Sequence, residues 1–167
     1  GEEHFPEITD ASTFEADTGD ADTLRKFLRW AKAEHPAKHY AVVFYSHGNG
    51  MAWCPDESAD SHLYPAELTD VLEEQDSLDL VVFDVCNMAG VENAYQWRPV
   101  DGRFGIDVVV ATPMAGFPFP WNDIFSRMRA GDDPTWLDPA TMTAQQFGEL
   151  VVDATDKQLS LIHIFRA

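Results

Sequence analysis

Three short apolar runs, rich in valine and aromatic residues, constrain the fold of this chain more than any other feature. They cover residues 40–45, 78–85 and 106–112. Apolar and polar residues do not alternate within them, which is typical of strands that are buried on both faces of a parallel sheet. We therefore expect three such strands, with residues 51–64 forming a polar loop after the first.

Segments with helical spacing of apolar residues separate and follow these runs. The first is expected to start at a cap formed by Asp22 or Thr23, and the second to begin at Pro65. The predicted helices cover residues 24–33, 65–75, 88–97, 121–128 and 144–157. Strands that alternate with helices imply right-handed crossovers and a sheet between two helical layers. The predicted fold class is α/β, a three-layer α-β-α sandwich with a mainly parallel sheet.

The domain organisation follows from length and from the absence of linkers. The 167 residues contain no repeat and no linker-like stretch, so residues 1–167 are interpreted as a single domain, a fragment that lacks parts at both ends. Residues 159–167, LSLIHIFRA, change to an apolar pattern unlike anything before them. We interpret this tail as either an unfinished strand or a non-native extension.

The charge of the chain excludes several kinds of partner. It has 29 acidic and 11 basic residues, a formal net charge of -18. Such a surface repels phosphate backbones and anionic membrane surfaces, so no nucleic-acid partner is expected. No apolar stretch approaches the roughly 20 residues that a membrane-spanning helix needs, so no membrane insertion is expected either.

Two predicted strands end in residues that can carry chemistry. His47 follows the first strand within YSHGNG, and Cys86 follows the second within DVCNMAGVE, just before a predicted helix. A cysteine at a helix N-terminus is favoured as a thiolate, and a nearby imidazole can carry its proton. Taken alone, Cys86 is more simply a buried core residue, and His47 is equally well explained as a turn residue or as a functional one. Together, at the carboxyl ends of neighbouring strands, they favour a catalytic pair.

The wider pattern around these residues resembles the clostripain family of cysteine peptidases. The resemblance rests on an apolar strand followed by HGxG, and then on an apolar strand followed by DxCxMxxxE, and it extends over residues 19–123. It implies a caspase-like fold and cysteine endopeptidase activity on peptide or protein substrates, without a required cofactor. In this reading Cys86 attacks the scissile carbonyl, His47 protonates the leaving amine, and the backbone N–H groups of Gly48 and Cys86 form the oxyanion hole.

The resemblance also suggests substrate-binding residues and a location. Asp84 matches an acid that lines the pocket for arginine or lysine before the scissile bond, although an acceptor at a strand end is an equally good interpretation. Thr112, which opens a Thr-Pro-Met sequence where the family often has an acid, and Trp121, at the end of GFPFPW, are further candidates. The Thr-Pro-Met sequence weakens the case for a basic preference. Secretion or attachment to the cell envelope is suggested by the family alone.

Other features are weaker. The acidic clusters Asp56, Glu57, Asp60 and Asp132, Asp133, Asp138 are candidate calcium ligands, because some family members use calcium, but neither has the EF-hand spacing. A solvated acidic surface explains them better, and no metal site is predicted. Cys54 is interpreted as a bystander thiol.

Two other functions remain open. One is a catalytically inactive module of the same fold that binds partners. The other is an esterase of the α/β-hydrolase type, which the absence of a G-x-S-x-G elbow and the order of histidine before nucleophile disfavour.

Overall fold

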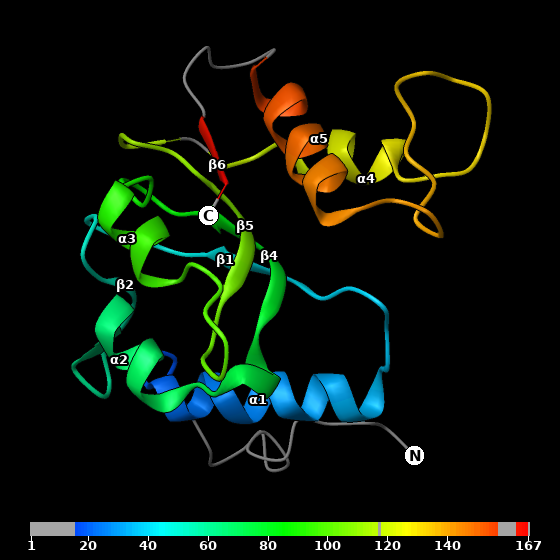
Figure 1. Cartoon of the computed structure of the whole chain (residues 1–167). Helices are drawn as coiled ribbons and strands as arrows, with labels where there is room; N and C mark the ends of the chain where they lie inside the picture. Colours follow the sequence, from blue (N-terminus) through cyan, green and yellow to red (C-terminus); the bar gives the residue numbers. More distant parts are fainter. Residues whose placement is uncertain (1–15, 117, 157–162, 167) are drawn as a thin grey trace.

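The computed structural model describes residues 16–116, 118–156 and 163–166, which form a sheet with helices on both sides (Figure 1). The strands of the sheet lie in the order β1 (Ala41–Tyr45), β4 (Leu78–Asp84), β5 (Ile106–Ala111) and β6 (His163–Arg166). β1, β4 and β5 are parallel, and β6 pairs with β5 in the antiparallel direction. The predicted α/β class with a mainly parallel sheet is confirmed.

The register places the ends of β1 and β4 side by side. Tyr45, the last residue of β1, pairs with Asp84, the last residue of β4. The segments that begin at Ser46 and Val85 therefore leave the sheet at the same edge. β6 includes part of the tail predicted to be unfinished or non-native, and the rest of that tail lies outside the described residues.

Two apolar cores attach helices to the two faces of the sheet. Alternate residues of β4 enter different cores: Val81 and Phe83 face one, and Leu80 and Val82 face the other. This explains why the apolar run does not alternate in sequence. The first core is covered by α1 (Ala21–Glu34), α2 (Pro65–Val71) and the hairpin of β2 (Trp53–Asp56) and β3 (Ser61–Leu63), and by Met88 and Trp97, which flank α3 (Val91–Gln96). The 3-10 helix Glu74–Asp76 lies between α2 and β4 in the chain. The second is covered by α4 (Trp121–Arg127) and α5 (Ala144–Asp156).

The helix predicted over residues 24–33 starts earlier than expected. Its cap is Asp20, whose carboxylate accepts a hydrogen bond from the Asp22 N–H at 2.9 Å. The prediction of a cap at Asp22 or Thr23 was wrong, because Asp22 already lies in the first turn. Among the helices of the described residues, none is long and apolar enough to cross a bilayer.

β1 is not buried on both faces, so that part of the prediction was wrong. Val43 is 40% exposed and Tyr45 is 69% exposed, whereas Val42 and Phe44 pack against the first core. β1 is the edge strand, and α5 contacts β4 and β5 but leaves the same face of β1 open. A chain segment that is apolar throughout therefore has one covered and one exposed face here.

Two further predictions of local structure were wrong. Residues 51–64 form a hairpin, β2 and β3, rather than a loop throughout; Trp53 from it is fully buried in the first core. The helix expected at residues 65–75 ends at Val71, because Leu72 is extended.

Candidate active site

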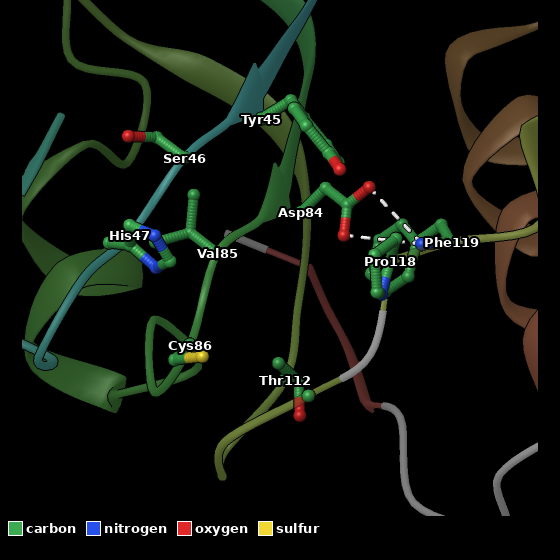
Figure 2. Close-up of a pocket in the computed structure, with 10 residues that line it drawn as sticks. Tyr45, Ser46, His47, Asp84, Val85, Cys86, Thr112, Pro118 and Phe119 are labelled. Carbon is green, nitrogen blue, oxygen red and sulfur yellow. Dashed lines mark hydrogen bonds between the residues drawn. The ribbon is translucent and has the colours of Figure 1, made fainter.

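A pocket of about 210 Å³ lies at the carboxyl ends of β1, β4 and β5 (Figure 2). Both predicted catalytic residues line it: His47, which is exposed, and Cys86, which is half-buried. The parallel pairing of β1 and β4 brings these two residues together although they are far apart in sequence. The remaining lining residues are Tyr45, Ser46, Asp84, Val85, Thr112, Gly116, Pro118 and Phe119.

The His47 loop packs closely against the segment that carries Cys86, and the contact is tightest at Gly48. A Cβ atom added to Gly48 would lie 2.5 Å from Val85 Cγ1, 3.1 Å from the Ala52 carbonyl oxygen and 3.3 Å from the Cys86 carbonyl oxygen. Only glycine permits this approach. The loop then returns, since the Cys54 N–H donates to the His47 carbonyl at 3.2 Å and the Asn49 N–H to that of Ala52 at 3.1 Å.

Cys86 does not lie directly before a helix, so the predicted stabilisation of its thiolate by a helix N-terminus was wrong. α3 begins at Val91, and Asn87 adopts a left-handed conformation with a φ of 65°. The segment pairs instead with the end of β5, because the Asn87 N–H donates to the Met114 carbonyl at 3.2 Å and the Ala89 N–H to that of Thr112 at 3.1 Å. Residues 87–90 therefore cannot wind into the predicted helix.

Asp84 lies buried at one side of the pocket. Its carboxylate accepts hydrogen bonds from the Phe119 N–H, at 3.2 and 3.1 Å, and from Trp121 Nε1, at 2.8 Å. These bonds hold the chain before α4 against the end of β4. In the described residues, no Lys, Arg or His forms an ion pair with Asp84. Burying a carboxylate is costly unless it is hydrogen-bonded or paired, and the described partners of Asp84 are hydrogen-bond donors without positive charge.

The two other candidate substrate-binding residues have different surroundings. Thr112 is buried and lines the pocket. Trp121 is absent from the described lining of the pocket and acts on it through its hydrogen bond to Asp84. From the same stretch, Gly116, Pro118 and Phe119 line the pocket, and residue 117 lies outside the described residues.

Sequence reasoning missed Tyr45 and Ser46. Tyr45 ends the apolar run 40–45 and Ser46 follows it, and nothing in that run indicates that β1 is an edge strand of the sheet. Tyr45 pairs with Asp84 across the two strands and is exposed on the pocket. Only the strand order could have identified it.

Cys54 differs from Cys86 in its surroundings. Burial raises the pKa of the Cys54 thiol, and a hydrogen bond with Ser46 offsets this only in part. A raised pKa leaves less thiolate at neutral pH, which disfavours Cys54 as a nucleophile. Both cysteines are free thiols.

The acidic clusters have other contacts. Asp56 is buried and accepts hydrogen bonds from the N–H groups of Thr18, Ser58 and Ala59, led by Thr18, which hold its pKa far below the ordinary range. Hydrogen bonds from Thr135 lower the pKa of Asp133. Within the described ranges, no three His, Cys, Asp or Glu side chains are grouped to hold a metal ion.

Comparison with known proteins agrees with the resemblance seen in the sequence. A family model described as the clostripain family matches residues 1–165. Clostripain from Hathewaya histolytica is 38% identical over 184 residues, an alignment that covers 92% of this chain and 35% of clostripain. The chain thus spans about a third of the length of that relative.

Solved structures show the same fold. A secreted cysteine protease from Bacteroides thetaiotaomicron, in complex with an irreversible peptide inhibitor, has a TM-score of 0.60 at 22% identity, over 86% of this chain and 40% of that one. An inactive zymogen protease from Parabacteroides distasonis has a TM-score of 0.52 at 25% identity, over 70% of this chain and 34% of that one. This chain therefore belongs to the clostripain family of cysteine peptidases and has the caspase-like α/β fold of that family.

Proposed function

We propose that this chain is the catalytic part of a cysteine endopeptidase that acts on peptide or protein substrates, with Cys86 as nucleophile and His47 as proton carrier. The observation that carries the proposal is the single pocket, at the carboxyl ends of two paired strands, that both residues line. Family membership supports it. The description of one structural relative as secreted supports action outside the cell.

The reaction needs only groups that the chain supplies. The Cys86 thiolate attacks the scissile carbonyl carbon, and the electron pair of the C=O bond moves onto oxygen. When that pair returns, the C–N bond breaks and the His47 imidazolium gives its proton to the departing amine. Water then attacks the thioester carbonyl carbon while His47 accepts its proton, the C–S bond breaks, and the carboxylic acid leaves with the Cys86 thiolate and the His47 imidazolium restored. No cofactor takes part.

The oxyanion is stabilised in this proposal by the backbone N–H groups of Gly48 and Cys86. Neither group donates a hydrogen bond to any part of the chain that the structure describes. Both belong to residues at the contact between the two loops, where Gly48 approaches the Cys86 carbonyl. Backbone donors fixed in this way can stabilise developing negative charge without rearranging.

Asp84 gives the proposed site a preference for arginine or lysine before the scissile bond. Its donors, Phe119 and Trp121, fix the carboxylate but bring no positive charge to it. Two carboxylate oxygens have about four acceptor positions, so at least one remains for a cationic ligand. Tyr45, across from Asp84, can cover the aliphatic part of such a side chain.

A covalent probe tests the proposal. A peptide with an electrophilic warhead after arginine is incubated with the chain, and the labelled residue is mapped by mass spectrometry. We expect labelling at Cys86, its loss in Cys86→Ala with the thermal midpoint little changed, and strong slowing in His47→Ala. No labelling by basic or neutral warheads would support an inactive binding module, and hydrolysis of esters that persists in Cys86→Ala would support an esterase.

A further inference from the structure

One buried amide joins the two loops that carry the proposed catalytic pair. Asn93 is 4% exposed, and its Nδ2 group donates to the Gly50 carbonyl and to the Met88 carbonyl, both at 3.2 Å. Gly50 lies three residues after His47, and Met88 lies two residues after Cys86. A single side chain therefore reaches both loops.

No equivalent link exists in the rest of the described chain. At the strand ends, the Ser46 N–H donates to the Asp84 carbonyl at a long 3.4 Å. Beyond that point, and apart from the Asn93 side chain, the described hydrogen bonds of residues 47–52 stay within their own loop and hairpin. Those of residues 86–90 go to the segment after β5 or, at Gly90, to the first turn of α3. Without Asn93, the two loops would be held together only by packing.

The loops are also in a conformation that needs to be held. Gly50 has a φ of 93° and Asn87 a φ of 65°, and a Cβ on Gly50 would lie 3.1 Å from the Asn87 carbonyl oxygen. Glycine adopts such a φ freely, and asparagine tolerates it better than most residues with a side chain, but at a cost in free energy that its surroundings must offset. The amide of Asn93 supplies such a constraint next to both positions.

Asn93 is itself well anchored. Its N–H donates to the Gly90 carbonyl at 3.1 Å, and its carbonyl accepts from the N–H of Trp97 at 3.2 Å. Trp97 is 1% exposed and stacks on Phe83 of β4. The position of the amide is therefore set by the core beneath the site rather than by solvent-exposed contacts.

We propose that Asn93 is a positioning residue for the catalytic pair: its buried amide group fixes the His47 loop against the Cys86 loop. The inference rests on the proposed peptidase function. Asn93 is not among the described residues that line the pocket, so it acts only through the relative placement of imidazole and sulfur. Both its partners are carbonyl oxygens, so only an NH2 group satisfies the two of them.

Asn93→Asp tests the proposal, because it keeps the shape and puts a carboxylate against two carbonyl oxygens. Asn93→Ala is the second variant, in case the first fails to fold. Thr155→Val is the matched control: its hydroxyl is buried, donates to the Val151 carbonyl at 2.7 Å, and lies in α5 on the opposite face of the sheet. Each variant is compared per folded molecule, with the folded fraction taken from circular dichroism.

Two readouts separate positioning from mere support of the fold. The first is kcat and KM on an arginine peptide: we expect kcat to fall about 10- to 100-fold in both Asn93 variants, since a displacement of about 1 Å can cost 100-fold, with KM changed less than about threefold. The second is the rate of Cys86 alkylation by iodoacetamide against pH. A thiol beside an imidazolium ionises at lower pH than a free one, so the profile should move to higher pH in these variants and stay in place in Thr155→Val.

Other outcomes would overturn the inference. A fall in thermal midpoint with kcat and the alkylation profile unchanged would make Asn93 purely structural. A change confined to KM would assign it to substrate binding instead. If the parent chain cleaved no peptide and took no warhead, the proposed function would fail, yet the alkylation profile would still decide about Asn93: an unmoved profile refutes the inference, and a shifted one supports it.

Discussion

Replacing Gly48 by alanine is the most direct test of how tightly the site is built. The added Cβ atom would lie 2.5 Å from Val85 Cγ1, a distance that real Cβ contacts essentially never show, and 3.1 Å from the Ala52 carbonyl oxygen. Val85 is 3% exposed and follows directly on β4, so it cannot simply move into solvent. The loop that carries His47 must therefore shift.

The magnitude of the effect has two parts. Overpacking of this kind costs about 1–3 kcal/mol of unfolding free energy. If the Gly48 N–H is an oxyanion donor, its displacement should also lower kcat by about 100- to 1000-fold. Denaturant unfolding and peptide hydrolysis measure the two parts separately. Val85→Ala removes the clashing methyl, so the double variant should recover part of both losses, with a coupling of about 0.5–3 kcal/mol in stability.

Gly148→Ala controls for overpacking away from the site. Its added Cβ would lie 3.2 Å from Val110 Cγ2 and 3.3 Å from Val108 Cγ1, beneath α5. We expect this change to alter stability and leave kcat as in the parent. The reasoning would be refuted if Gly48→Ala kept the kcat of the parent, or if Val85→Ala added its loss to that of Gly48→Ala without any recovery.

Three further predictions concern charge. Asp84→Asn should lower kcat/KM on arginine substrates about 30-fold or more, since the loss of a buried charge partner costs about 2–5 kcal/mol, and should spare neutral substrates; an equal loss on both would leave Asp84 a structural acceptor only. Burial alone would raise the pKa of Asp76, but hydrogen bonds from Arg29 and from the Glu73 N–H outweigh it and lower that pKa. The stability this gives is present above the unfolded value of about 3.9 and is lost as pH falls below it, so the unfolding free energy of Asp76→Asn should depend less on pH below about 4 than that of the parent. A net charge of -18 should make the unfolding midpoint rise with added salt, and a midpoint that stayed constant would count against self-repulsion.

The sequence was most informative where burial on both faces leaves a local pattern. Strands β4 and β5 and the helices α4 and α5 lie within a residue or two of their predicted bounds, because their side chains enter a core whatever the strand order. The common location of His47 and Cys86 could be predicted because residues at the carboxyl ends of neighbouring parallel strands meet at one edge of the sheet. The exposure of Tyr45 and the late start of α3 could not be predicted from the sequence, because both depend on which other segments of the chain lie beside them in the fold.

The edge position of β1 explains why a side chain is needed to hold the His47 loop in place at the candidate site. Cys86 follows a central strand, and its loop is held on the β5 side by backbone hydrogen bonds to Thr112 and Met114. His47 follows an edge strand with no strand of the described chain on its outer side, so apart from the bonds to its own hairpin its loop is held to the sheet only from the β4 side. Support on that side comes from the close approach at Gly48 and from the Asn93 amide. The position of the His47 imidazole should therefore be more sensitive to mutation than that of the Cys86 sulfur. Substitutions at Gly48 and Asn93 should first slow the steps in which a proton moves, and only then lower the reactivity of the Cys86 thiolate.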